Sequence, residues 1–403
     1  MQNTASLPAD QFEELLRRLP AALDLDSLAR QTKAIERRRA LDSGADLLRL
    51  ALARGPGGLS LSETAAWATM LGLAEMSDPA VKYRLDKAVE FLDAVMVCQL
   101  ADKAPGAAVR WTGRTLRACD GSCFCEPGSK TTSWRLHAVY DVGRGGFSHF
   151  ELTDKHGAEA IERGAPVRGE IRIGDRNFAR APSLHRFRTQ SANQADFIVR
   201  VGWNAFSLTR PDGSDFDLIT HLGTLPAEMT PHEVMLRAKT GPLDPPLPLR
   251  LIIQRKTPEA TEAARKKLGN EAARKQRGLD PRSLVAAEFM ILGTSLPTEG
   301  HPAADVLMVY RLRWQIELAF KRLKSLLRMD RIPTQTERAS RSWLTAHLIL
   351  ALLCDDLGQE FLASSPLRTC STLSTPLRSG ACGTSPDGCC SSPSSAASLS
   401  MTS

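Results

Sequence analysis

Three acidic residues, far apart along the chain, stand in settings that suit metal-dependent chemistry on phosphodiesters. Asp120 lies in the run Cys-Asp-Gly-Ser, Asp175 lies in Gly-Asp-Arg, and Glu317 lies in a basic, helix-forming stretch. Carboxylate oxygens are the ligands that hard divalent cations such as Mg²⁺ prefer. Such cations activate an attacking oxygen and stabilise a leaving one. We therefore take Asp120, Asp175 and Glu317 as candidate catalytic and metal-binding residues.

The stretch around Glu317 combines several kinds of polar side chain at helical spacing. Tyr310, Arg313, Glu317 and Lys324 are separated so that, on a helix, they fall within an arc of about 60°. One stripe would then present a phenol, a guanidinium, a carboxylate and an ammonium together. Cationic groups beside a carboxylate can hold phosphates that do not react. This mixture is what phosphodiester chemistry requires.

Each acidic residue also has a simpler interpretation. An aspartate followed by glycine, as at Asp120, is most often a turn residue. Asp175 could cap the start of a helix, a role that is compatible with metal binding. Glu317 could merely pair with Arg313 or Lys321 on a helix surface. Surface pairing alone would not account for two aspartates at the ends of strands, and we therefore favour the metal site.

Other polar and aromatic residues carry less weight. Cys119, Cys123 and Cys125 with His137 invite a zinc interpretation, but their spacing is not a paired-cysteine pattern, and isolated thiols are favoured. Trp203 could stack on a displaced base.

The elements that would position the aspartates are short strands. Alternating apolar residues over 107–142 indicate two neighbouring strands, and Asp120 is expected just past the end of the first. A further strand over 169–173 ends directly before Asp175, and residues 158–163 could form a helix. Both aspartates would then lie at strand ends, where loops commonly carry functional groups.

The rest of the chain changes character several times. Apolar residues at helical spacing over 11–97 predict an N-terminal helical part, including one helix over 79–97, with room for a helix-turn-helix. Strand-like runs over 197–201 and 249–253 predict a β-rich insertion. A basic helix over 259–277 follows, either solvated or in contact with DNA, and a long helix over 303–329 carries Glu317.

The motifs together resemble a known family. The spacing Tyr-x2-Arg-x3-Glu-x6-Lys at 310–324, with Asp-Gly-Ser at 120–122 and Gly-Asp-Arg-Asn-Phe at 174–178, is similar to the signature of bacterial insertion-sequence transposases of family four, within the DDE superfamily. The resemblance covers roughly residues 110–360. It implies metal-dependent nicking of DNA, followed by attack of the freed 3′-hydroxyl on another phosphodiester, which is DNA transposition.

The resemblance also implies a fold and roles for individual residues. The fold would be a ribonuclease-H-like catalytic core, with a β-rich insertion before the glutamate helix. Asp120, Asp175 and Glu317 would bind two Mg²⁺ or Mn²⁺ ions. Tyr310, Arg313 and Lys324 would hold DNA phosphates and the displaced strand at the transposon end.

We therefore expect an α/β protein of several parts. These are an N-terminal helical domain over 1–105 that could bind DNA, the first part of the catalytic core over 106–190, the β-rich insertion over 191–285, the second part of the core over 286–363, and a disordered low-complexity tail over 364–403. The tail is rich in Ser, Pro and Cys, where family members usually continue as helix. This departure bears on full activity and dimer assembly but leaves the acidic residues in place.

Composition agrees with a nucleic-acid partner. The 403-residue chain carries a formal net charge of +7, and its sequence pI is about 9.0. A basic protein suits a polyanion such as double-stranded DNA. No apolar run is long enough to cross a bilayer and no secretory signal is recognisable, so we expect a cytoplasmic, nucleoid-associated protein and no membrane partner. In the DNA complex we expect a homodimer.

Two rival functions stay open at this level. The chain could be a catalytically impaired relic that only binds DNA, although the three acidic residues argue against loss by substitution in the active site. It could also be a stand-alone metal-dependent nuclease, which would cut DNA without joining strands. Strand-joining products separate the transposase from the nuclease, and any cleavage product separates both from the relic.

Overall fold

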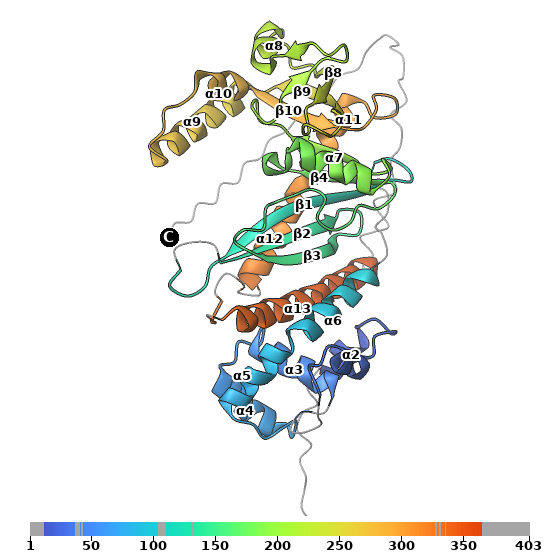
Figure 1. Cartoon of the computed structure of the whole chain (residues 1–403), viewed down its shortest axis with the longest axis vertical. Coiled ribbons are helices and arrows are strands. Elements are labelled where there is room, and N and C mark those ends of the chain that lie inside the picture. The colour runs from blue at the N-terminus through green and yellow to red at the C-terminus, as the bar shows by residue number, and fades with distance from the viewer. Residues whose placement is uncertain are drawn as a thin grey trace, which may run out of the picture. The chain divides into compact units, whose positions relative to one another are not determined.

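A single mixed sheet of ten strands organises the chain (Figure 1). The computed structural model describes residues 12–36, 41, 43–103, 110–129, 133–326, 329, 332–334 and 336–364. The order of strands across the sheet is β3-β2-β1-β4-β5-β10-β9-β8-β6-β7. The strands are β1 (Thr115–Phe124), β2 (Trp134–Asp141), β3 (Gly146–Asp154), β4 (Glu170–Gly174), β5 (Asp196–Arg200), β6 (Leu208–Thr209), β7 (Asp215–Phe216), β8 (His232–Ala238), β9 (Leu247–Arg255) and β10 (Phe289–Thr294).

The direction of the strands changes across the sheet. Strands β1, β2 and β3 form an antiparallel meander, whereas β1 pairs with β4, and β4 with β5, in parallel. From β5 onwards, through β10, β9 and β8, neighbours are antiparallel again. Segment 191–285, expected as a β-rich insertion, thus provides the parallel strand β5 and also strands that extend the same sheet beyond β10.

Strand β1 is longer than its sequence pattern indicates. We expected it to end before Asp120, but β1 continues to Phe124, and this expectation was wrong. The continuation is held by the antiparallel partner β2, which pairs Asp120 with Ala138 and Gly121 with His137. On the other side, pairing with β4 stops at Ala118. Asp120 therefore lies inside a hairpin but just beyond the end of the parallel pair β1/β4.

Helices occupy the N-terminal part, the loops of the sheet and the C-terminal part. They are α1 (Phe12–Arg17), α2 (Leu25–Gln31), α3 (Gly44–Arg54), α4 (Leu61–Met70), α5 (Asp78–Lys87), α6 (Val89–Ala101), α7 (Ala181–Gln190), α8 (Leu218–Thr224), α9 (Pro258–Arg274), α10 (Pro281–Ala286), α11 (Ala303–Tyr310), α12 (Trp314–Leu326) and α13 (Glu337–Ser364), with 3₁₀ turns η1 (Arg176–Phe178) and η2 (Arg311–Arg313).

Three helical expectations need correction. The single helix expected over 79–97 is divided at Ala88 into α5 and α6, and the long helix expected over 303–329 is interrupted by η2. Residues 158–163 form an irregular loop with a turn at 161–162 rather than a helix. In that segment the carbonyl oxygens of Ile161 and Arg163 accept hydrogen bonds of 2.7 Å from the buried Arg172 guanidinium, so they do not serve a helical ladder.

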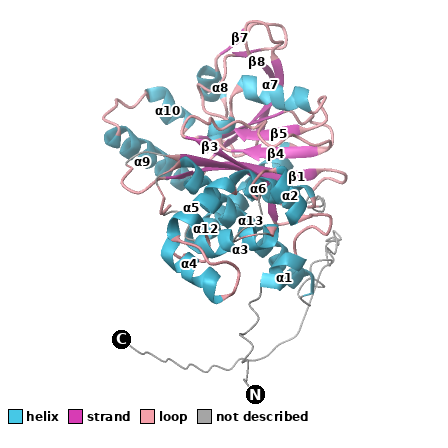
Figure 2. Cartoon of the chain, turned by 60° about the horizontal axis from the view of Figure 1, so that its bottom comes forward, coloured by secondary structure: helices cyan, strands magenta, loops and turns pink. Residues whose placement is uncertain are grey.

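The two faces of the sheet belong to two different buried clusters. Apolar side chains from β1, β4 and β5 on one face pack with the helices α3, α5, α6, α12 and α13, and those on the other face pack with α7. In Figure 2 these five helices lie together on one side of the strands, with α7 on the other. Because side chains alternate along a strand, cluster membership tells which way each residue points.

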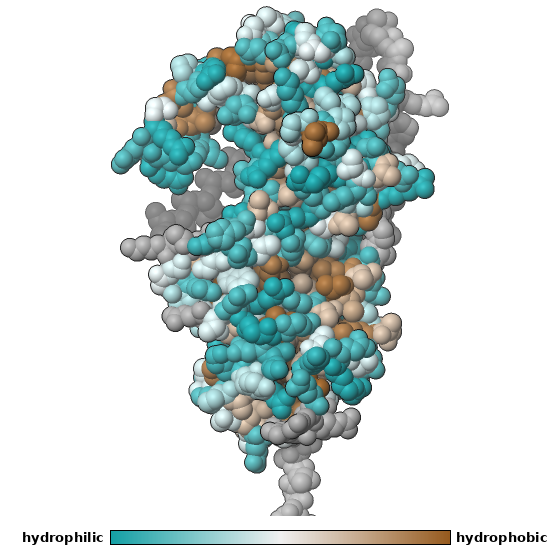
Figure 3. All heavy atoms as spheres, viewed as in Figure 1, coloured by the Kyte–Doolittle hydropathy of each residue, from teal (hydrophilic) through white to brown (hydrophobic). Residues whose placement is uncertain are grey.

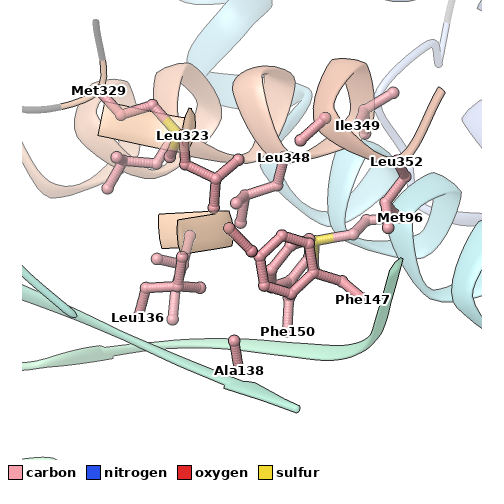
Figure 4. Close-up of a cluster of buried hydrophobic side chains, with 14 of the residues drawn as sticks. Met96, Leu136, Ala138, Phe147, Phe150, Leu323, Met329, Leu348, Ile349 and Leu352 are labelled. Atoms are coloured by element: carbon pink, nitrogen blue, oxygen red, sulfur yellow. The ribbon is translucent and has the colours of Figure 1, made fainter. Parts of the chain in front are cut away.

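The first of these clusters joins parts of the chain that are distant in sequence. Figure 4 shows Met96 of α6, Phe147 and Phe150 of β3, and Leu323 of α12 in contact around one apolar centre, with α13 closing it. Charged pairs add to the packing of α6 on α13, where Arg338 binds Glu90 at 2.6 Å. The N-terminal helices are thereby fixed to the sheet and to the C-terminal helix.

The remaining expectations concern membranes and the tail. None of the helices in the described part is long and apolar enough to span a bilayer. The tail expected over 364–403 lies, from residue 365 onwards, outside the described residues.

Removal of the Phe147 ring tests whether this cluster supports the fold. Phe147 is only 2% exposed and contacts the rings of Tyr140, Phe150 and Phe320. Phe147→Ala should lower the free energy of unfolding by about 3–5 kcal/mol because it leaves a cavity. Urea unfolding measures the change, with Met235→Ala, an exposed truncation on β8, as the control. Equal losses in both variants would contradict the assignment of this core.

Candidate active site

Asp120 and Asp175 leave the sheet on the same face. Leu116 and Ala118 of β1, and Ile171 and Ile173 of β4, belong to the cluster that also contains the buried side of α12. Asp120 follows Ala118, and Asp175 follows Ile173, by two residues in extended backbone. A period of two therefore directs both carboxylates toward α12, the helix of Glu317.

The strand register also makes these aspartates neighbours. Ala118 of β1 is paired with Ile173 of β4. This is the last pair of the two strands, and Asp120 and Asp175 each follow it by two residues, so the register brings the two aspartates to the same end of the pair. The electrostatic influence of Asp175 on Asp120 agrees with this proximity.

The environment of Asp120 disfavours its charge. The pKa of this carboxyl group is raised to about 6, mainly by burial and also by the charge of Asp175. The Gly121 N–H, which donates to Oδ1 at 2.8 Å, works in the opposite direction. The Arg313 guanidinium lowers it, whereas Glu159 adds a second repulsion. Asp120 is thus a partly buried carboxylate with two other carboxylates, those of Asp175 and Glu159, close to it. Such a site is suited to bind a cation.

Asp175 and Glu317 are each held by a local partner. Asp175 caps the turn η1, and its Oδ1 accepts a hydrogen bond of 2.7 Å from the Asn177 N–H, which confirms the cap and the strand end expected there. Glu317 lies on α12, where its Oε1 is 2.6 Å from Nη2 of Arg313. The pairing of Glu317 with Arg313, foreseen as the simpler interpretation, is thus present.

An open hollow of about 510 Å³ lies between β1 and α12. Asp120 and Ser122 line it from the strand, and Glu317 and Lys324 line it from the helix. The Lys324 ammonium lies 5.5 Å from the centroid of the Phe124 ring, at the end of β1. The hollow brings together two of the three predicted carboxylates and one predicted phosphate ligand.

The other two signature residues lie toward Asp175. Tyr310 is 8% exposed, and burial raises the pKa of its phenol, which is under the influence of Arg313, Arg200 and Asp175. Because η2 separates Tyr310 from α12, the four residues do not form one straight helical stripe. Glu317 and Lys324 nevertheless share the hollow with Asp120, Arg313 acts electrostatically on Asp120, and Tyr310 is influenced by Asp175.

Comparison with known proteins decides the family. The model of the family described as "Transposase DDE domain" matches residues 113–353, more than half of the chain. The chain belongs to this family.

Relatives extend the match to insertion-sequence transposases. The chain is 37% identical over 359 residues to the putative transposase InsL of insertion sequence element IS186A from Escherichia coli strain K12, covering 89% of this chain and 96% of that relative. Identity to the transposase of IS421 from Escherichia coli is also 37%, over 360 residues, with the same coverage. The protein is therefore an insertion-sequence DDE transposase, and an enzyme.

Similarity to other proteins is weaker. The transposase of IS231F from Bacillus thuringiensis subsp. israelensis is 32% identical over 105 residues, which cover 26% of this chain and 22% of that relative. A piggyBac transposase, solved by cryo-electron microscopy as a synaptic complex with hairpin DNA, aligns with a TM-score of 0.45 and 11% identity, covering 87% of this chain and 76% of that one.

The carboxylates of this transposase do not form a closed ligand set. In the described part of the chain, no three His, Cys, Asp or Glu side chains are gathered closely enough to hold one ion. Two carboxylates in a row and a third across the hollow nevertheless offer the oxygen donors that hard divalent cations prefer. The same finding leaves Cys119, buried, and the exposed Cys123 and Cys125 as free thiols.

Two groups near the aspartates escaped the sequence interpretation. Glu159 comes from the loop between β3 and β4, and its Oε1 lies 2.5 Å from the position that a β-carbon at Gly121 would occupy. The glycine after Asp120 thus admits a close approach within a strand, whereas we considered only a turn. Arg200 ends β5 beside Asp175. Neither residue is part of a local motif, so only the tertiary register reveals it.

The raised pKa of Asp120 predicts how stability depends on pH. The folded-state pKa of about 6 lies above the ordinary value of 3.8, so ionised Asp120 destabilises the fold above pH 6, and this penalty disappears as pH falls through 6 toward 4. Asp120→Asn in EDTA should stabilise the protein at pH 8 by on the order of 1–2 kcal/mol, reduced for solvent screening. Thermal unfolding at pH 5 and pH 8 measures this gain, and an equal gain at both values would contradict the shifted pKa.

Proposed function

We propose that this transposase cleaves DNA strands at the ends of an insertion sequence and joins them to a target, using Asp120, Asp175 and Glu317 as ligands of two Mg²⁺ or Mn²⁺ ions. The observation that carries the proposal is the register that sets the two aspartates side by side on the face covered by the glutamate helix. The spacing Tyr-x2-Arg-x3-Glu-x6-Lys at 310–324 supports membership of insertion-sequence family four.

Bound divalent ions would activate the attacking oxygen and stabilise the leaving oxygen of each phosphodiester exchange. The residues of the chain position the reactants for this chemistry. Asp120 is held half-buried by the hairpin β1/β2, and Asp175 is oriented by its cap on η1. Glu317 is held by Arg313 at 2.6 Å, and rotation of its own side chain would let it exchange this partner for a cation.

The signature cations and phenol suit the phosphates that do not react. Lys324 lines the same hollow as Asp120, so its ammonium can reach a phosphate oxygen that approaches the site. Arg313, once released by Glu317, presents a planar guanidinium for bidentate contact with phosphate. The Tyr310 phenol, protonated because burial raises its pKa, can donate a hydrogen bond on the Asp175 side.

The parts of the chain are proposed to have the following roles. The order β3-β2-β1-β4-β5, antiparallel and then parallel, supports a ribonuclease-H-like core made of residues 106–190 and 286–363, to which residues 191–285 add the strand β5. Residues 191–285 would be the insertion and residues 1–105 an N-terminal helical domain. We further propose a homodimer in the complex with double-stranded DNA, and a location in the cytoplasm on the nucleoid.

Replacement of each carboxylate tests the proposed chemistry. Asp120→Asn, Asp175→Asn and Glu317→Gln should each lower the rate of DNA cleavage by about 10³-fold or more, since loss of metal ligands removes several kcal/mol of transition-state stabilisation. The substrate is a duplex that carries the element's own ends, with Mg²⁺ or Mn²⁺. Asp154→Asn, another aspartate at a strand end, is the matched control and should cleave normally.

Three results would contradict the proposal in different ways. Normal cleavage by the carboxylate variants would exclude these residues as the active site. Nicks without joined products from the unsubstituted protein would indicate a nuclease. A folded protein that binds DNA but gives neither product would indicate a relic.

A further inference from the structure

Asp120 and Asp175 begin a row of side chains that runs across the sheet from β1 to β4. On the next strand, β5, this row continues with Arg200. Ile173 of β4 is paired with Ile198 of β5, so the next position in register beside Asp175 is Arg200. Ile198 belongs to the same buried cluster as Ile173. Arg200, two residues later on β5, therefore leaves the sheet on the α12 side, as the aspartates do.

A second cation shares this face farther along the sheet. Arg200 is paired with Leu292 of β10, and Leu292 with Ile252 of β9. Leu292 and Ile252 both belong to the cluster on the α12 side. Lys256 follows Ile252 by four residues, and its backbone is still bound to the Glu288 carbonyl at 2.8 Å. The alternation thus directs the Lys256 side chain to the same face as Arg200.

A third cation comes from the turn after β4. The Cδ atom of Arg176 lies 3.4 Å from the position that a β-carbon would occupy at Gly202, just beyond the end of β5. This places the stem of Arg176 against the strand of Arg200. Burial above all, together with the charges of Arg200 and Arg176, lowers the pKa of Lys256 to about 8, so the three groups also influence one another electrostatically.

These three cations lack the partners that neighbouring cations have. Within the described residues, Arg176, Arg200 and Lys256 form no ion pair with a carboxylate, although the Lys256 ammonium donates to the Ala287 carbonyl at 2.7 Å. Asp175 acts electrostatically on Arg200 but forms an ion pair with none of the three, so the cations still repel one another, and a bound anion would relieve this repulsion.

A second hollow, lined by Lys256, Glu262 and Glu288 among others, does not contribute to this excess of positive charge. Glu262 and Glu288 line that hollow, and Glu288 binds Arg255 at 2.6 Å and Arg265 at 2.7 Å. Its arginines are therefore already compensated. Helix α9, which borders it, has no buried residue, and Figure 3 shows hydrophilic side chains over its outer end. The positive charge without an ion-pair partner is therefore that of Lys256 itself and of Arg200 and Arg176.

We propose that Arg176, Arg200 and Lys256 form a phosphate track that binds successive backbone phosphates of DNA beside the carboxylates, on the β5–β9 side. The proposal rests on the proposed function in one respect, namely that DNA is the substrate. Arginine offers paired donors to phosphate oxygens and lysine a compact charge, which suits a backbone in either strand independently of base sequence. The track fixes the direction in which the DNA leaves the active site.

The salt dependence of DNA binding tests the track. A fluorescent duplex of arbitrary sequence is titrated with the full chain in EDTA, at KCl concentrations from about 50 to 200 mM. Arg200→Gln and Lys256→Gln should each weaken binding about five- to tenfold near 0.1 M salt and reduce the slope of log affinity against log salt by about 0.9. The double variant should lose about twice that slope, and Arg200→Lys and Lys256→Arg should keep most of it.

Arg186→Gln is the matched control because Arg186 lies on α7, over the opposite face, and is paired with Glu162 at 2.6 Å. It removes one charge as well but should leave the slope unchanged. If the Gln variants, folded by circular dichroism, have the slope of Arg186→Gln, the track is excluded. If Arg200→Gln does not fold, the pair Lys256→Gln and Lys256→Arg decides the question alone.

Failure of the track and failure of the proposed chemistry give different results. Asp120→Asn should lose cleavage of its own substrate, whereas the slope of its DNA binding should not be reduced, because this variant removes no cation. Unchanged slopes in the Gln variants, with cleavage lost in Asp120→Asn, exclude only the track. Cleavage retained in Asp120→Asn, with reduced slopes in the Gln variants, excludes only the assignment of the active site.

Discussion

The site depends on the register between two parallel strands, β1 and β4. With Ala118 opposite Ile173, Asp120 and Asp175 become neighbours on one face, and a slip by one residue would turn one of them into the opposite core. The register is pinned from that opposite face. Glu170, fully buried on β4, binds Arg172 of its own strand at 2.5 Å and Arg117 of β1 at 3.4 Å. A buried charged pair is costly to break, so this network favours one register over its alternatives.

The helices then bring the third carboxylate to the row. Ile316, Ala319, Phe320 and Leu323 give α12 an apolar side that packs in the same cluster as Ala118 and Ile173. Glu317 lies next to this side and therefore faces the hollow in front of β1. Helices α6 and α13 cover the same cluster, so the position of the glutamate depends on packing between segments that are more than two hundred residues apart. A transposase built in this way holds Asp120 on a strand and Glu317 on a helix, and it holds Asp175 directly at the end of a strand.

Much of this could be predicted from local sequence, and the rest could not for a definable reason. The strand before Asp175, the helix of Glu317 and the mixed α/β class follow from periodicity and turn residues, which are local signals. The length of β1 past Asp120, the interruption at 311–313, and the approach of Glu159 to Gly121 depend on partners in other elements. Arg200 belongs to the row only through the pairing of β4 with β5. The three acidic residues could be predicted together because the family signature relates residues that are distant in sequence, which local patterns do not.

The order of charges along the face constrains how a polyanion can lie on it. Asp120 and Asp175 alone would repel a phosphate, and burial already raises the pKa of Asp120 to about 6, so the acidic end accepts phosphate only when cations neutralise it. Arg200, Arg176 and Lys256 have the opposite imbalance and attract phosphate without ions. Under the two proposals, DNA would first be held at the basic end, and a phosphodiester would settle over the carboxylates only once divalent ions are present. Binding and chemistry would thereby be separated on one continuous face, with Arg200 at the boundary between them.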